Sequence, residues 1–235
     1  MGSTAAGTNA PRVAAQSILE RWAPAAGSLF AALLVAAVIV GSVGLGDVGN
    51  NVTEITRNFQ TADYQSTGGL ILILVMLSAL CFLWFLADIA ATIRSLSPGM
   101  LSSLVQIGGA VFISAFVPAT IIVISPLLNI GHSQLEGGDP KTIATIYVEL
   151  NEIAFFLFGF AGIAGALLMS AAARVANRSG LLPHWGAVVV VVGAVVTALT
   201  TWMLVLPIFL VVLWVFAASV WRMILSRRGV LAPIA

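Results

Sequence analysis

The chain consists mainly of long apolar runs separated by short polar segments, a pattern typical of helices that cross a membrane. Four runs have the length that a crossing requires, since a hydrocarbon core of about 30 Å takes about 20 helical residues. A fifth region, residues 185–221, has no charged side chain and would form a single helix of about 55 Å. That length exceeds one crossing. We therefore expect a break within residues 197–207, with Pro207 in the first turn of a new helix.

The pattern predicts an all-α fold, a polytopic membrane protein with six transmembrane helices. We expect a flexible N-terminal tail over residues 1–22, a six-helix domain over 23–225 and a short C-terminal tail over 226–235. The predicted spans are about 23–46, 68–91, 98–128, 144–173, 184–201 and 204–225.

Three short motifs indicate where helices begin or end. Asp139 before Pro140 predicts an N-cap followed by the first residue of a helix. Ser97 before Pro98 predicts the same kind of start for the third helix. Gly180 predicts the end of the fourth helix, because glycine readily adopts the left-handed conformation that follows a last turn.

Composition supports a membrane environment and excludes other classes. Hydrophobic residues make up 60% of the chain and charged residues 8%, against roughly 25% charged in a soluble domain. The net charge is +1 and the basic residues are scattered, so we expect no nucleic-acid partner. Cys81 is the only cysteine, which excludes an internal disulfide.

The distribution of basic residues orients the six predicted spans. Cytoplasmic loops collect arginine and lysine, and translocated loops do not. With six spans, only Arg57 and Lys141 fall on the outer side, so we expect both termini in the cytoplasm. The residues that fall on the cytoplasmic side are Arg12, Arg21, Arg94, Arg174, Arg178, Arg222, Arg227 and Arg228.

Asp88 is the strongest candidate for a functional polar group, because a charge within a span is costly and is retained for a reason. Arg94 stands six residues further along the same helix and points away from Asp88. A partner must therefore come from another segment, and the candidates are Arg174, Arg178 and Arg222. Two interpretations stay open: a structural ion pair or interfacial carboxylate, and a relay for protons or ions.

Two further carboxylates, Glu149 and Glu152, lie three residues apart on one face of the fourth predicted helix. About 20 residues counted back from Arg174 place both of them just outside the hydrocarbon core. We interpret them as solvated groups on a projecting helix end. The alternative is a cation or substrate contact at an outer vestibule.

Other features indicate packing rather than chemistry. Pro118 predicts a kink in the third helix. Small residues four apart let a neighbouring helix approach closely, and we assign this role to Ala161, Gly162, Gly165 and Ala166. The chain has no phosphate-binding glycine loop, no zinc-type His-Glu-x-x-His and no serine elbow, so we expect no enzyme activity, cofactor or metal site.

The connector "RVANRSGLLPHWGAVV", residues 174–189, supports a resemblance in combination with the six spans and the polar loop after the first span. The chain resembles a family of uncharacterised multi-pass bacterial membrane proteins, in which a basic, glycine-ended turn runs into Leu-Pro, a basic residue and Trp. The matching residues are Arg178, Gly180, Leu182, Pro183, His184 and Trp185, with histidine in the basic position. The resemblance implies a place in the bacterial cytoplasmic membrane and implies no catalytic or binding residue.

Two functional hypotheses follow. The first is a noncatalytic membrane protein that acts through contacts with lipids, other membrane proteins or a second copy of itself, and it predicts tolerance of Asp88→Asn. The second is a small-solute or ion/proton-coupled transporter or channel that uses Asp88, alone or together with Glu149 and Glu152. It predicts a continuous polar cavity among the helices.

Overall fold

The computed structural model describes residues 10–44, 62–136, 139–203 and 205–227, and these residues form helices and contain no strand. The helices are α1 (Ala10–Gly44), α3 (Ala62–Leu96), α4 (Met100–Glu136), α5 (Pro140–Arg178), α6 (His184–Leu199), the 3₁₀-helix η1 (Thr201–Met203) and α7 (Val205–Arg227). The prediction of an all-α fold is confirmed for this part of the chain.

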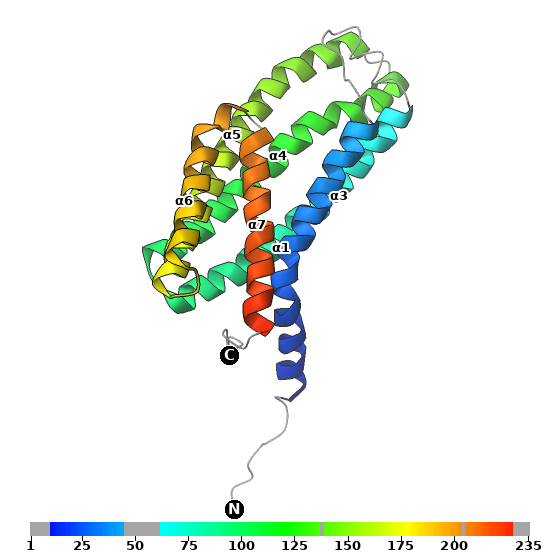
Figure 1. The fold of residues 1–235 in the computed structure, drawn as a ribbon. Coiled ribbons are helices and arrows are strands. Elements are labelled where there is room, and N and C mark those ends of the chain that lie inside the picture. The colour runs from blue at the N-terminus through cyan, green and yellow to red at the C-terminus, as the bar shows by residue number, and fades with distance from the viewer. Residues whose placement is uncertain (1–9, 45–61, 137–138, 204, 228–235) are drawn as a thin grey trace, which may run out of the picture.

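Successive helices run in opposite directions through one bundle (Figure 1). α1 packs against α3 and α7, α4 packs between α3 and α5, and α6 packs against α5. The start of α1, the turn between α3 and α4, the turn between α5 and α6, and the end of α7 all lie toward one end of the bundle (Figure 1). We call this the arginine end, because Arg94, Arg178 and Arg227 stand in the last turns of α3, α5 and α7 there.

Five of the described helices are long and apolar enough to cross a membrane: α1, α3, α4, α5 and α7. Their outer faces carry large apolar side chains, such as Val38, Leu80 and Phe160, which are 66%, 63% and 63% exposed. A soluble protein does not leave such continuous apolar surface in water, whereas lipid tails solvate it without cost. The described part of the chain is that of an all-helical membrane protein.

The predicted break near residue 200 is confirmed. α6 ends at Leu199, η1 follows, and α7 begins at Val205, so that Pro207 is the third residue of the new helix. A proline costs nothing there, because N–H groups in the first turn have no partner within the helix. α6 itself has 16 residues and is shorter than the other apolar helices.

Two of the three predicted helix-end motifs are confirmed. Asp139 precedes α5, and its Oδ2 accepts hydrogen bonds from the backbone N–H (3.3 Å) and the hydroxyl (2.9 Å) of Thr142, as an N-cap does. Gly180 follows the end of α5 with φ +73°, and its N–H donates to the carbonyl of Asn177. This left-handed residue ends α5 and begins the turn to α6.

The third motif was wrong in its position. α4 begins at Met100 rather than at Pro98, because Pro98 and Gly99 form the turn after α3. Gly99 has φ +145°, a conformation that favours glycine, and its carbonyl accepts a hydrogen bond from the Ser102 hydroxyl at 2.7 Å. The turn therefore takes both residues, and the helix starts after them.

The N-terminal region also differs from expectation. Residues 1–22 were expected to form a flexible tail, but α1 begins at Ala10, so residues 10–22 are helical. The segment is rich in alanine, which has the highest helix propensity, and Pro11 stands in the first turn. The start of the tail and most of the expected C-terminal tail, residues 1–9 and 228–235, lie outside the described residues.

Aromatic side chains form a continuous chain of ring contacts through the bundle core. Phe82 of α3 lies 5.1 Å from Phe30 of α1 and 5.1 Å from Phe112 of α4, measured between ring centroids. Phe116 continues the series to Phe158 of α5 at 5.9 Å. Such tilted ring pairs add to the packing energy and fix the helices at defined separations.

A glycine allows α4 and α5 to approach closely. A methyl group at Gly108 of α4 would lie 3.0 Å from the carbonyl oxygen of Ala164 and 3.0 Å from the backbone nitrogen of Leu168 in α5. Both neighbours are backbone atoms, which cannot move aside without shifting the helix. The close contact of α4 and α5 therefore depends on Gly108.

We predict that Gly108→Ala lowers the thermal unfolding midpoint of the purified protein, with a cost of about 1–3 kcal/mol from overpacking. The matched control is Gly193→Ala in α6, where the added methyl group lies 3.8 Å from the nearest atom, in Met169. The control should hold or raise the midpoint, because alanine favours helix over glycine. Equal midpoints for the two variants would contradict the close packing.

Candidate functional site

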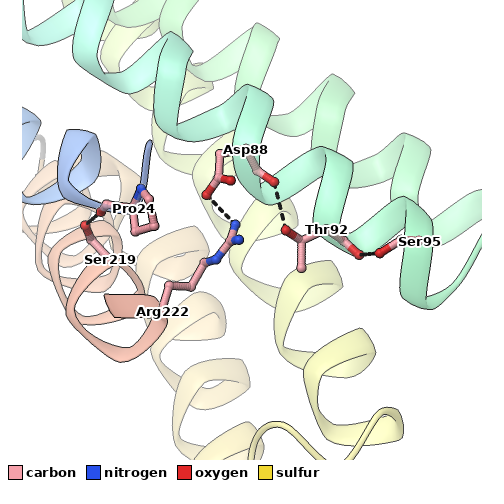
Figure 2. Close-up of polar contacts among 6 residues, drawn as sticks. All are labelled: Pro24, Asp88, Thr92, Ser95, Ser219 and Arg222. Carbon is pink, nitrogen blue, oxygen red and sulfur yellow. Dashed lines mark hydrogen bonds and ion pairs between the residues drawn. The ribbon is translucent and has the colours of Figure 1, made fainter. Parts of the chain in front are cut away.

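Two polar side chains on one face of α7 reach two different neighbouring helices. Ser219 and Arg222 are three residues apart, which places them on the same face of a helix. Ser219 contacts α1, and Arg222 contacts Asp88 of α3 (Figure 2). Both contacts lie toward the arginine end, and together they fasten α7 to the first two described helices of the chain.

Asp88 and Arg222 form an ion pair, in which a guanidinium nitrogen of Arg222 donates to Oδ2 of Asp88 (Figure 2). The two side chains are 15% and 16% exposed, so most of each lies away from solvent. A charge in such surroundings is costly unless an opposite charge compensates it. Of the three arginines considered as partners, the structure pairs Asp88 with Arg222, whereas Arg174 and Arg178 are exposed at the end of α5.

Short polar side chains near Asp88 bond within their own helix. The Thr92 hydroxyl donates to the backbone carbonyl of Asp88 at 3.0 Å, and the Ser95 hydroxyl donates to that of Thr92 at 2.7 Å (Figure 2). Arg222 differs from them, because its buried Nε has no hydrogen-bond partner. The guanidinium has five N–H donors, and its contact with Asp88 leaves the one on Nε buried and without a partner.

The Ser219 hydroxyl joins two backbone groups of α1. It donates to the carbonyl of Pro24 and accepts from the N–H of Ser28 at 3.0 Å. These are the two groups that would pair with each other in a regular α-helix. The Ser28 hydroxyl also donates to Ser219 at 3.0 Å, and Ser219 is fully buried. Gly27 makes room for this contact, since a methyl group there would lie 3.0 Å from Cβ of Ser219.

A cavity of about 240 Å³ lies beside this polar cluster, between α3, α5, α6, α7 and the turn after α5. Its wall is apolar except for Thr92, Arg222 and the indole groups of Trp214 and Trp221. The Thr92 hydroxyl is already bonded within its own helix. Arg222 is the one cation on the wall. We call this space the α3–α7 cavity.

A second, shallower groove between α1 and α7 is lined only by apolar side chains, among them Ala32, Ile39 and Phe209. Neither this groove nor the α3–α7 cavity has a carboxylate on its wall. The structure therefore gives these two spaces the chemistry of lipid tails rather than of water or ions.

The remaining polar candidates lie apart from the ion pair. Glu149 and Glu152 are exposed near the opposite end of the bundle from Asp88, in the first half of α5. Arg94 donates to the amide oxygen of Gln106 in α4 at 2.8 Å, on the exposed surface. Within the described residues, His, Cys, Asp and Glu side chains do not gather in a group of three or more.

The small residues of α5 are buried inside the bundle. A methyl group at Gly162 would lie 3.1 Å from Cβ of Pro207, and one at Gly165 would collide with Val211, both in α7. Ala161 is also buried. Ala166 is 7% exposed, so the four residues expected to pack contact neighbours within the chain.

Pro118 lies on the exposed face of α4, which continues past it to Glu136. It is not on the wall of either cavity described above.

Comparison with protein-family models, with curated proteins and with solved structures found no match to this chain. The bundle of apolar helices defines the class, an all-helical membrane protein. Its assignment to a family rests on the sequence resemblance alone.

The contact of Ser219 with α1 was not anticipated. Serines are common in membrane helices and bond to their own backbone, as the Ser42 hydroxyl does with the Ile39 carbonyl at 2.9 Å. The available signal was the combination of Pro24 and Gly27 in α1, because a proline within a helix and a nearby glycine together open a helix to a neighbour.

The ion pair changes the expectation that Asp88→Asn is tolerated. Removal of the carboxylate leaves Arg222 charged and without its partner, although its side chain is only 16% exposed to solvent. We predict that Asp88→Asn destabilises the protein by about 3 kcal/mol, the lower end of the cost of breaking a buried pair. The double variant Asp88→Asn/Arg222→Gln should recover most of this loss, as measured by unfolding of the purified protein in a double-mutant cycle. If the effects of the two substitutions on the free energy of unfolding were additive, the result would contradict an interaction between Asp88 and Arg222.

A second prediction concerns Ser219. We expect Ser219→Ala to cost about 1 kcal/mol, because it removes interhelical hydrogen bonds and leaves a backbone N–H and a carbonyl of α1 to pair with each other. Ser226→Ala, at an exposed position of the same helix, is the matched control and should leave the unfolding midpoint unchanged. The contact would be refuted if the two alanine variants unfolded alike.

Proposed function

We propose that this chain is an integral protein of the bacterial cytoplasmic membrane that crosses the bilayer six times, with both termini in the cytoplasm. We further propose that it is noncatalytic and acts through contacts with lipids and other membrane proteins. Lipid is the partner that the apolar cavities favour.

The sixth crossing would be made by α6 together with η1. The 16 residues of α6 span about 24 Å at 1.5 Å per residue, and η1 adds about 6 Å at 2.0 Å per residue. Their sum is close to the thickness of a hydrocarbon core, about 30 Å. The alternating directions of the helices also support a crossing by α6 (Figure 1).

The distribution of charged and aromatic residues supports the orientation. The arginine end collects Arg94 and Arg178 at helix ends, whereas Lys141 stands at the start of α5 toward the other end. Trp185 and Trp221, 72% and 42% exposed, lie in the first turn of α6 and near the end of α7. Tryptophan prefers the boundary between hydrocarbon and head groups, so these two rings fit the cytoplasmic interface.

The observation that carries the functional proposal is the Asp88–Arg222 ion pair. It joins two helices and compensates the charge of the carboxylate that a transporter would need for cargo or protons. The serine contact between α1 and α7 likewise uses a polar group for helix packing. Transport through the bundle would need a polar path, and the two cavities described above have apolar walls.

Cysteine labelling tests the topology. In a Cys81→Ser background, we predict that an impermeant maleimide added to intact cells labels Lys141→Cys and Met203→Cys but not Arg178→Cys. Residues 141 and 178 stand at opposite ends of α5, and Met203 follows α6. Labelling of residue 178 in place of residue 141 would show that the protein has the opposite orientation in the membrane. Protection of Met203→Cys would show that α6 does not cross.

Proteoliposomes test the functional class. We predict that vesicles carrying the protein show the same proton and potassium leak under an imposed potential as vesicles carrying Asp88→Asn/Arg222→Gln. A passage that used Asp88 would lose its flux in the double variant, because the titrating carboxylate is gone. A flux present in the unmodified protein and absent from the variant would overturn the noncatalytic, non-transporting assignment.

A further inference from the structure

We infer that the α3–α7 cavity binds one acyl chain of an anionic phospholipid, with the lipid phosphate at Arg222. This inference rests on the proposed function, because it names the lipid partner and requires the arginine end to lie at a membrane surface.

The cavity has the chemistry of a hydrocarbon site. Its wall brings together apolar side chains from α3, α5, α6 and α7, including Ile93, Val175, Val190 and Leu225. An apolar cavity of about 150 Å³ is large enough for a six-carbon ring, so about 240 Å³ accommodates several methylene groups of one chain. Water gains little here, because a water molecule needs two or more polar partners and the wall supplies few.

Arg222 supplies a place for the head group. Its side chain forms part of the cavity wall, and its Nε is buried without a hydrogen-bond partner. Asp88 contacts the guanidinium through another nitrogen and is not part of the wall. The contact with Asp88 uses one of the two terminal nitrogens of the guanidinium, which leaves the other for a ligand in the cavity, and phosphate oxygens accept from guanidinium donors with good geometry.

The charge around the cavity favours an anion. Arg94, Arg174 and Arg178 are exposed at the same end of the bundle. Each is within two residues of a residue of the cavity wall, or of the turn that closes it. Basic clusters between membrane helices on the cytoplasmic side attract anionic lipid head groups. A zwitterionic lipid lacks the net charge that these arginines complement.

Native mass spectrometry of the full chain in a non-ionic detergent tests the inference, with phosphatidylglycerol and phosphatidylcholine of identical acyl chains as probes. We expect one phosphatidylglycerol per chain, bound about fivefold more tightly than phosphatidylcholine, since one arginine near the surface contributes about a factor of five. Equal affinity for the two lipids would overturn the inference.

Variants that fill the cavity locate the bound chain. Ala176→Phe and Ala217→Phe add a ring from opposite walls, from α5 and α7, and each should abolish the bound lipid. Ala91→Phe places the same ring on an exposed position of α3 outside the wall and should retain it. Two filling variants are used so that misfolding of one, seen by circular dichroism, leaves the other informative. Lipid retained by a folded filling variant would overturn the site.

The double variant Asp88→Asn/Arg222→Gln tests the head-group contact. It keeps the cavity and the net charge but removes the guanidinium that contacts the phosphate, so phosphatidylglycerol should bind more weakly than it does to the unmodified protein. Loss of binding only on neutralisation of Arg174 and Arg178 would place the lipid on the outer surface and overturn the cavity assignment. Competition by palmitate as strong as by phosphatidylglycerol would assign the site to a free fatty acid instead. None of these outcomes bears on topology, which the cysteine labelling tests separately.

Discussion

A carboxylate within an apolar helix needs an opposite charge, and the arrangement of α3 and α7 follows from this requirement. Arg222 meets it for Asp88, and the pair brings together residues 134 positions apart in the sequence. Lipid tails are as apolar as leucine, so hydrophobicity alone does not choose among helix partners in a bilayer. A charge pair does choose, because every other rotation of α7 leaves two unpaired charges in surroundings of low dielectric constant. The Asp88–Arg222 pair is therefore a polar contact that selects how α7 packs beside α3.

The other contacts set the distances between the helices. Ring contacts from Phe30 through Phe82 to Phe112 hold α1, α3 and α4 at fixed separations. Gly108 lets α4 approach the backbone of α5, and the small residues of α5 receive Pro207 and Val211 of α7. Each of these contacts is short-ranged and depends on shape. The α3–α7 cavity lies between α3, α5, α6 and α7, where three of the four wall residues from α5 are alanines.

Much of the fold follows from sequence, because the length of an apolar run and the chemistry of helix ends are local properties. The break before Pro207, the N-cap at Asp139 and the left-handed Gly180 were all predicted from a few residues each. The start of α4 was misplaced by two residues, since Pro98 serves a turn as well as it serves a helix start. The site was only partly predictable. Three arginines satisfied the charge rule for Asp88, and the choice depended on how each helix is rotated about its axis, which apolar residues on all faces leave undetermined.

The contact between Ser219 and the backbone of α1 has a consequence for how the chain is made. The two partners are 191 and 195 positions apart, and they belong to the first and last helices of the described chain. During synthesis α1 enters the membrane long before its partner exists. The contact forms only after α7 has been synthesised. A product that lacks α7 therefore loses both contacts at once: the α1 backbone lacks Ser219, and Asp88 lacks Arg222.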